Sequence, residues 1–358
     1  MASQRVDSTD KCTCWISYKS FETSCTEPNI ITFHIKASNF TEQDRKKKRI
    51  VLREFDTRVS ALRNTAGGIL FIHITHRNIN DRNLSNFDQF VDKSLKNLIA
   101  DGCSFVESYS RKWLSCQEGI LILTVAKESC VSSVSLNTKV CSDHEIEFPS
   151  TFELIRFVSK GQHGVSEAPE NPEHRPFHQN AKNWVEDRHI QLKTFDEPTF
   201  RTYCKGNNKS WEVNFVDYVW NKLRFQEYLT CMSKVPRGGS YYVGISEWKN
   251  QVPPDVHGIP LRSTKTNITD RFKQKLSTVT VYDFDDTFKS GYEEENIIEI
   301  KFHDLKTGNS VLEMVVKCVK GIVFYDNGPL AYAIEDKDKI VKIDKVQWIR
   351  KIRSWRMQ

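Results

Sequence analysis

The densest group of side chains suited to chemistry is basic and lies early in the chain. It consists of six residues: Arg45, Lys46, Lys47, Lys48, Arg49 and Arg53. Side chains of this kind neutralise nucleic-acid phosphates without reading the bases, and the binding they provide weakens as salt increases. On a helix the six would spread around most of the circumference, so a solvated helix end is the alternative interpretation.

A second basic group occurs in the second half of the chain. Its members are Lys205, Lys209, Lys222, Arg224 and, beside a glycine turn, Arg237. Three aromatic residues flank the same stretch: Trp211, Tyr241 and Trp248. Such rings can stack on unpaired bases of single-stranded RNA, although each ring taken alone is more typical of a hydrophobic core. We therefore expect RNA-binding side chains in both halves of the chain.

The ten cysteines do not form a recognisable metal motif. Cys12 and Cys14 are close together but lack a second pair, and Cys130, Cys141 and His144 are too widely spaced for the usual patterns. Free and mostly buried thiols are the expected state. Serine, histidine and aspartate positions do not resemble a catalytic triad either.

Composition places the chain among globular proteins. It has 358 residues, of which 39% are hydrophobic and 27% charged, with a modest net charge of +6. Its apolar runs, such as 119–126, are less than half of the roughly 20 residues that cross a bilayer. Residues 1–25 lack the apolar core of a signal peptide, so the cytosol or nucleus is expected.

One local pattern occurs twice. Residues 61–74 predict the end of a helix, a glycine turn and a buried strand, and residues 230–245 predict the same, with the glycine pair 171 residues later. The stretches 152–157 and 346–351 form a second echo in the same order. We therefore predict two homologous halves of roughly 150 residues each.

The glycine pairs are poor candidates for a phosphate-binding loop. Neither Gly67-Gly68 nor Gly238-Gly239 precedes a helix, and no Gly-Lys-Ser/Thr follows. We expect them to permit positive φ angles in tight turns from helix to strand.

The remaining pattern indicates α+β halves with mixed sheets, joined by a proline- and charge-rich linker that begins near residue 160. Strands are predicted at 69–74, 120–125, 241–245, 297–302, 312–318 and 322–325.

These segments together resemble the Schlafen core domain. The resemblance covers about residues 35–355 and depends on Phe40–Arg49, Arg58–Gly68, Glu212–Phe215, Gly238–Ile245 and the closing segment 321–352. It implies a U-shaped core of two homologous lobes with a positively charged groove that binds RNA. The implied division is an N-terminal extension at 1–34, an N-lobe at 35–160, a linker at 161–196 and a C-lobe at 197–358.

The resemblance also implies which residues could cleave RNA. Family members hold Mg²⁺ or Mn²⁺ with two glutamates five residues apart on the strand that opens the second lobe, and with a third acid after the next strand. The matching positions are Glu212, with Asn207 in place of the other glutamate, and Glu247, with Ser246 as the alternative alignment. An amide in place of a carboxylate removes a charge attraction to the cation that, even between unit charges, is about 4 kcal/mol at 4 Å and an effective dielectric of 20. Self-sufficient catalysis is therefore not expected.

The short, divergent chain is most similar to the nematode Schlafen-like subunits that process the 5′ ends of piRNA precursors. This implies a cytoplasmic, perinuclear or organelle-associated RNA endonuclease complex with other Schlafen-like chains as partners. The family's zinc site retains only Cys318, so no zinc is expected there. A stand-alone tRNA or rRNA endoribonuclease and a non-catalytic RNA-binding or scaffold protein are the alternatives.

Overall fold

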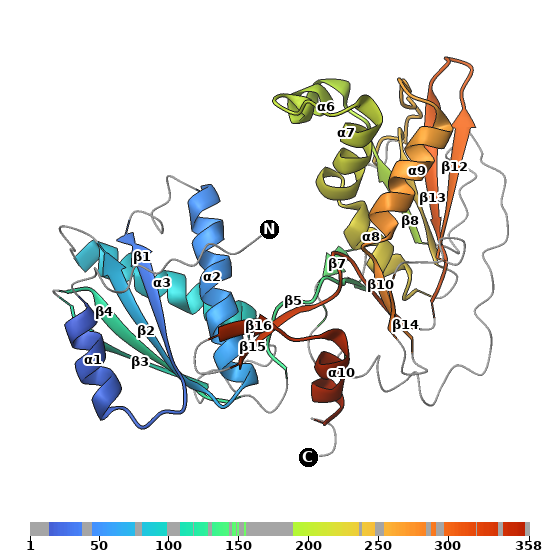
Figure 1. Ribbon diagram of the computed structural model, residues 1–358. Helices are drawn as coiled ribbons and strands as arrows, with labels where there is room; N and C mark the ends of the chain where they lie inside the picture. The colour runs from blue at the N-terminus through green and yellow to red at the C-terminus, as the bar shows by residue number, and fades with distance from the viewer. Residues whose placement is uncertain are drawn as a thin grey trace. The chain divides into compact units, whose positions relative to one another are not determined.

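The computed structural model describes most of the chain. The described residues are 14–37, 45–75, 81–98, 108–116, 118–127, 131–142, 145–147, 149, 154, 189–235, 238–247, 254–283, 288–290, 297–319, 321–335 and 339–354. They form mixed α+β structure with several sheets, as expected (Figure 1). The chain divides into two compact units, one made of 1–135 and 329–358 and the other of 136–328. None of the described helices is long and apolar enough to cross a membrane.

The first unit contains a four-stranded mixed sheet of order β1-β2-β4-β3. β1 and β2 are parallel, and the other two pairings are antiparallel. The elements of this unit before residue 136 are α1 (Trp15–Ser24), β1 (Ile30–Lys36), α2 (Arg45–Asn64), β2 (Gly68–Thr75), α3 (Asp81–Leu98), β3 (Tyr109–Ser115), β4 (Ile120–Val125) and β5 (Ser133–Ser135).

Helices cover both faces of this sheet (Figure 1). Leu70, Ile72 and Ile74 of β2 point to the face covered by α2 and α3, and they belong to the larger core of this unit. Ile69 and Phe71 point to the opposite face and pack against α1. This alternation follows from the two-residue period of a strand, and the run of apolar residues arises because both faces are covered.

The second unit contains a sheet with the same order and the same directions. β8 and β9 are parallel, β13 pairs with β9, and β12 pairs with β13, both antiparallel. The elements of this unit are β6 (Val140–Ser142), β7 (Glu145–Glu147), β8 (His189–Lys193), α6 (Glu197–Cys204), α7 (Trp211–Asp217), the π-helix η5 (Tyr218–Lys222), α8 (Phe225–Met232), β9 (Gly239–Val243), α9 (Lys265–Leu276), β10 (Thr280–Asp283), β11 (Phe288–Ser290), β12 (Ile298–Asp304), β13 (Ser310–Val316) and β14 (Gly321–Phe324).

The glycine turns have the predicted role. Gly67 and Gly68 have φ angles of 80° and 138° between α2 and β2, and Gly238 has a φ of 66° between α8 and β9. A Cβ atom at Gly68 would collide with the carbonyl oxygen of Asn29, and one at Gly238 would collide with that of Val316. Glycine is therefore required both for the backbone conformation and for the close approach of a neighbouring strand.

Both units also hold a smaller sheet that uses a distant part of the chain. In the first unit β5 pairs with β15 (Leu330–Glu335), which pairs with β16 (Lys339–Lys342), and α10 (Lys345–Ser354) follows. Asn64 at the end of α2 donates hydrogen bonds to the carbonyls of Ser132 and Tyr332. The C-terminal segment therefore completes the first unit.

In the second unit β10 pairs with β11 and β14. The segment after residue 136 packs here as well, because Thr138 donates to the carbonyl of Val323 and Lys234 donates to the hydroxyl of Thr138. The unit boundaries at 136 and 329 thus differ from the expected lobe boundaries at 160 and 197. The expected boundary at residue 35 lies within β1, and the end of the expected linker forms β8.

Candidate functional site

The two predicted acidic residues lie in different surroundings. Glu212 is in the first turn of α7, so the prediction of a strand at this position is wrong. Ser210 donates a hydrogen bond to its carboxylate, and this bond is the main reason that the pKa of Glu212 lies below its ordinary value. Glu247 lies just after Ile245, is exposed, and forms an ion pair of 2.6 Å with Lys193 of β8.

These carboxylates do not belong to a cluster of ligands. Among the described residues, the one group of three or more cysteine, histidine or acidic side chains close enough to share an ion contains neither Glu212 nor Glu247. Asn207 supplies only an amide, whose nitrogen faces the carbonyl of Tyr203 at 3.5 Å. This donor set does not fit a magnesium or manganese centre, which requires several oxygen ligands around one ion.

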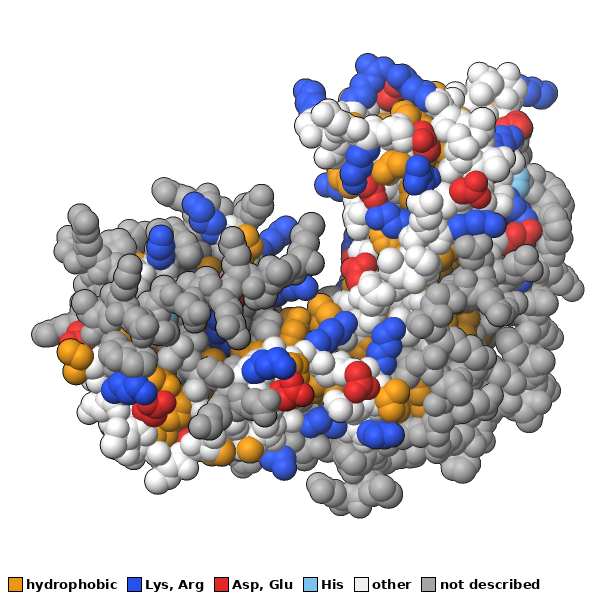
Figure 2. Space-filling view, viewed as in Figure 1, with side chains coloured by type: hydrophobic (Ala, Val, Ile, Leu, Met, Phe, Trp, Pro, Cys, Tyr) orange, Lys and Arg blue, Asp and Glu red, His pale blue; other side chains and the backbone are white. Residues whose placement is uncertain are grey.

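A pocket lies beside α6 and α7. Its volume is about 320 Å³, and it includes Asn207 and two further residues of the predicted region, Lys209 and Trp211. The lining residues are Phe195, Glu197, Phe200, Arg201, Cys204, Asn207, Lys209, Trp211, Asn214, Pro260 and Arg262. Figure 2 shows basic and hydrophobic side chains interspersed over the part of the second unit that α6 and α7 form. α6 begins at this pocket with Asp196 as its N-cap, whose side chain accepts a hydrogen bond from the backbone N–H of Thr199.

Cations outnumber anions on the pocket wall. Glu197 accepts hydrogen bonds from both Arg201 and Arg262, so one carboxylate is shared by two guanidinium groups. The hydrogen bond from Arg201 is the main reason that the pKa of Glu197 lies below its ordinary value. Lys209 is half-exposed and pairs with Asp217 at 2.8 Å.

Asp217, which forms the ion pair with Lys209, is largely buried. It also pairs with Lys275 of α9 at 2.6 Å. Burial opposes ionisation of this carboxyl, but the hydrogen bonds from Lys209 and Lys275 outweigh burial and lower its pKa. Two lysines therefore share one buried carboxylate, and the wall retains a net positive charge.

A buried amide on the pocket wall has an unused acceptor. Asn214 is 4% exposed, and its nitrogen donates to the carbonyl of Lys209 at 2.9 Å. Its Oδ1 atom has no hydrogen-bond partner in the part of the chain that the structure describes. An unpaired buried acceptor costs about 1–3 kcal/mol unless a ligand or water supplies a donor.

The predicted aromatic residues have different outcomes. Trp211 lines the pocket and stacks on Phe215, with 4.9 Å between ring centroids and an interplanar angle of 6°. Tyr241 is fully buried and donates a hydrogen bond to the carbonyl of Leu223, so it is a core residue and not a stacking surface. Trp248 lies outside the described residues.

The predicted basic residues that the structure describes lie on or beside several helices. The first group begins α2, where Lys47, Arg49 and Arg53 are exposed, Lys48 is partly exposed, and the side chains of Arg45 and Lys46 are outside the described set. In the second unit, Lys205 is exposed at the end of α6, and Lys222 is exposed at the end of η5. Arg224, at the start of α8, pairs with Glu227 at 2.7 Å. Arg237 lies outside the described residues.

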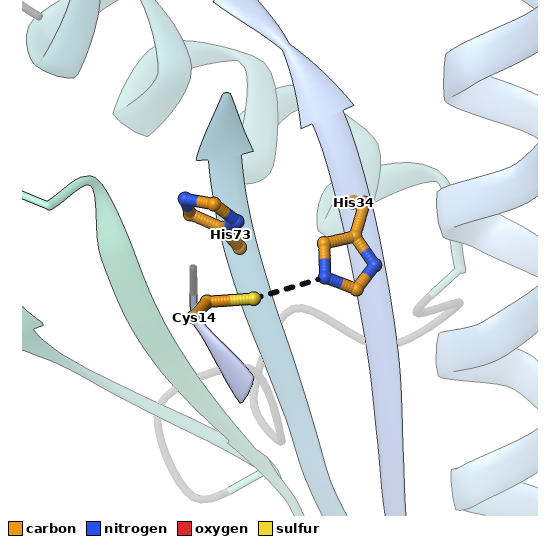
Figure 3. Close-up of side chains that lie close together, drawn as sticks. All are labelled: Cys14, His34 and His73. Atoms are coloured by element: carbon orange, nitrogen blue, oxygen red, sulfur yellow. Dashed lines mark hydrogen bonds between the residues drawn. The ribbon is translucent and has the colours of Figure 1, made fainter. Parts of the chain in front are cut away.

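The structure brings together one set of chemical groups that the sequence patterns did not predict. Cys14, His34 and His73 lie side by side in the first unit, each offering a ligand atom within 4.8 Å of the others (Figure 3). The Sγ atom of Cys14 is 3.1 Å from Nε2 of His34. The only available signal was Cys14 itself, because the two histidines are far from it in sequence and become neighbours through the pairing of β1 with β2.

Burial shapes the chemistry of these histidines. It lowers the pKa of His34, with a further contribution from Arg58. It also lowers the pKa of His73, where His34 adds to the effect and Glu118 opposes it. Both rings are therefore neutral near pH 7, the form in which imidazole binds metals.

The other described cysteines have varied environments. The thiols of Cys25, Cys116, Cys204 and Cys318 are free, as expected, but none of the four belongs to the buried core. Partial burial raises the pKa of Cys318. Cys231 is fully buried and disulfide-bonded, so the expectation of a free thiol is wrong at this position.

Comparison with known proteins does not add a relative. No protein-family model matches the chain, and no curated protein matches it.

Proposed function

We propose that this chain is an RNA-binding subunit of a Schlafen-type endonuclease complex that processes small-RNA (piRNA) precursors, with a degenerate active site of its own. The repeated strand order of β1-β2-β4-β3 and β8-β9-β13-β12 supports the two homologous lobes of such a core, for which we propose the U shape. The helix, glycine turn and strand that carry the resemblance occupy the same place in both sheets.

The pocket of the second unit is the observation that carries the RNA-binding part of the proposal. Arg201, Lys209 and Arg262 offer cationic groups, as needed to contact backbone phosphates. Trp211 offers an aromatic ring that can stack on an unpaired base. Single-stranded RNA presents phosphates and unstacked bases together, which matches these cationic and aromatic groups.

The carboxylates favour a supporting role over independent catalysis. Glu212 is engaged by Ser210, and Glu247 by Lys193. A lysine beside Glu247 competes with any cation for that carboxylate. We therefore propose that partner subunits, other Schlafen-like chains in the cytoplasm, supply the metal-binding acids of the complex.

Binding of a fluorescent single-stranded RNA to the purified chain tests the pocket. The variant Arg201→Gln/Lys209→Gln leaves Glu197 paired with Arg262 and Asp217 paired with Lys275, so neither carboxylate loses its last cation. Affinity is expected to fall about tenfold or more at low salt, and the log–log salt slope to decrease by about 0.7 per lost phosphate contact.

A matched control separates the pocket from net charge. Lys112→Gln/Lys306→Gln removes the same charge from two exposed lysines that do not line the pocket. If the two double variants lowered RNA affinity equally, the loss would come from net charge alone, and the pocket would be rejected as the binding site.

Cleavage by the assembled complex tests the catalytic part. The assay measures how fast the reconstituted complex cleaves the 5′ end of a precursor RNA. Glu212→Gln in this chain is expected to leave that rate within about twofold of the wild-type rate. A loss of about 100-fold or more would assign metal-dependent catalysis to this chain instead. Cleavage by the isolated chain would favour the stand-alone endoribonuclease.

A further inference from the structure

The outer face of the first unit's sheet holds an unusual set of polar groups. His34 and His73 are directly opposite each other across the parallel pair β1 and β2. Their rings meet edge to face, with centroids 5.7 Å apart and an interplanar angle of 83°. Apolar residues of the same face, Ile69, Phe71, Ile120 and Ile122, pack against α1.

Cys14 approaches the histidines from a third element. It lies directly before α1 and is 5% exposed, and its thiol faces the two rings (Figure 3). Cys14 does not cap α1 with its side chain, so helix capping does not explain its position. Three residues of the types that bind transition metals therefore converge from α1, β1 and β2 in an apolar setting.

We propose that Cys14, His34 and His73 bind a divalent transition-metal ion, with zinc as the expected occupant. One thiolate and two imidazoles form a donor set that zinc favours, and zinc sites keep either a fourth protein ligand or a water molecule. A tetrahedral zinc ion with bond lengths of about 2.3 Å to sulfur and 2.0–2.1 Å to nitrogen places its ligand atoms about 3.3–3.6 Å apart. The observed separations of 3.1 Å for one pair and at most 4.8 Å for all three are close to that arrangement.

The surroundings of His73 also suit a metal ligand. Its ring forms a hydrogen bond with the backbone of Glu118. Metal-binding histidines commonly use the second ring nitrogen in this way, which fixes the orientation of the ring. The neighbouring β2 residue Ile74 pairs with Gly119 through a backbone hydrogen bond of 2.8 Å, so the segment that orients His73 is itself anchored to the sheet.

A catalytic thiol–imidazole pair explains the site less well. A nucleophilic cysteine must reach a substrate, whereas Cys14 is buried under α1 and beside the aromatic residues that pack there. A metal ion is small enough to be taken up as the unit folds. It would connect α1 to the two parallel strands and stabilise the packing of the helix.

Metal analysis of the full-length protein tests the proposal. The chain, purified without chelators, is expected to contain about one zinc ion by mass spectrometry, and Cys14→Ser and His73→Gln are expected to reduce this at least tenfold. Cobalt substitution is expected to give thiolate-to-metal charge-transfer absorption that Cys14→Ser abolishes. Cys116→Ser, which removes an exposed thiol of the same unit, should change neither result.

Two outcomes would overturn the site. One is an equal zinc content in the wild-type chain and in Cys14→Ser. The other is a wild-type chain that, stripped of metal, cannot withdraw one equivalent of zinc from a chromophoric chelator; this titration decides the matter even if the variants do not fold. RNA binding is measured in parallel, so failure of the pocket and failure of the metal site remain distinguishable.

Discussion

The main sheets of the two units share strand order and direction but differ on their outer faces. In the first unit Phe71 pairs with Ile122, and both pack under α1. At the equivalent place in the second unit Tyr242 pairs with Glu313. Glu313 accepts hydrogen bonds from Ser240 and Tyr242 and pairs with His303 at 2.7 Å. The same backbone arrangement therefore supports apolar packing at this place in one unit and a polar network in the other.

This difference indicates which features specify the sheet. The glycine turns and the strands that enter the inner cores are alike in both units, because helices α2 and α8 must reverse directly into a buried strand. The outer faces are free to differ, because they only have to match whatever covers them. Chemistry specific to one unit is thus expected on the outer face or on the helices, and not in the shared inner core.

The largest effect is expected from the shared turns. Gly238→Ala places a Cβ atom against the carbonyl of Val316 at a φ of 66°, and Gly68→Ala does the same against Asn29. Each is expected to lower the free energy of unfolding by about 3 kcal/mol or more, as strain and a backbone collision combine. Urea denaturation measures the loss.

Gly308→Ala is the control for the turn prediction. It has a similar φ of 83°, but an added Cβ atom would meet nothing within 4 Å. Its expected cost is about 1 kcal/mol from backbone strain alone. If Gly238→Ala were no worse than Gly308→Ala, the close approach to Val316 would not constrain the turn.

The next effect concerns the polar face. Glu313→Ile copies the residue that the first unit has at this place, and it leaves the partners of a side chain that is only 5% exposed without their acceptor. We expect a loss of about 3 kcal/mol, because the buried Ser240 hydroxyl, Tyr242 and His303 each lose their hydrogen bond to Glu313. Thermal unfolding monitors this, and a neutral result would mean that the network contributes no net stability.

Glu313 also predicts a pH dependence. Burial opposes its ionisation, but hydrogen bonds from His303, Tyr242 and Ser240 outweigh burial and lower its pKa. A carboxyl with a depressed pKa contributes stability above its unfolded-state pKa and loses it as pH falls through the folded value. The acid-side decrease in stability should therefore be smaller in Glu313→Ile than in the wild type.

The first unit contains a buried carboxyl with the opposite behaviour. Asp56 on α2 is 7% exposed, and its Oδ1 atom has no hydrogen-bond partner among the described residues. Burial raises the pKa of Asp56 to about 7. Its protonated form is favoured by folding, so the associated stability is complete below pH 3.8 and is lost as pH rises through about 7.

Asp56→Asn is therefore expected to stabilise the protein at pH 8 by about 2–3 kcal/mol and to have little effect near pH 4. The gain should shrink progressively between these values. Urea denaturation at several pH values measures the difference in unfolding free energy between the variant and the wild type. A difference that does not change with pH would contradict the raised pKa.

The smallest effect concerns the helix ends. The hydroxyl of Thr264 accepts a hydrogen bond from the N–H of Asn267 at the start of α9, whereas the side chain of Cys14 makes no such cap bond at the start of α1. Thr264→Ala is expected to lower stability by about 1 kcal/mol, and Thr264→Ser to lower it much less. An equal loss in both variants would show that the methyl group, and not the hydroxyl, matters.

Much of the fold could be predicted from local patterns. All six predicted strands are present, within a few residues of their expected ends, because apolar runs next to glycine turns are strong signals. The short strand β8 could not be predicted, since its five residues form a strand only through pairing with β9. The family resemblance implies a strand at Glu212, but Ser210 and the residues after it form the start of a helix.

The candidate sites were less predictable. The pocket contains Lys209 and Trp211, which sequence reasoning identified, but also Arg262, which comes from a different segment. The histidines of the metal cluster are 39 positions apart and are aligned by strand register, which depends on the packing of the entire sheet. Register of this kind is a tertiary property, and a single sequence contains no direct signal for it.

The assignment of β15 and α10 to the first unit affects how the protein is made. A ribosome releases residues 1–135 long before residue 329, so the first unit lacks α10 and two strands of its smaller sheet, β15 and β16, until the second unit has been made. Until then, the surface of α2 that packs against β15 stays uncovered. A chaperone or a partner that binds early would protect it. A premature stop after the second unit would therefore leave the first unit incomplete, although most of the first unit is encoded at the start of the chain.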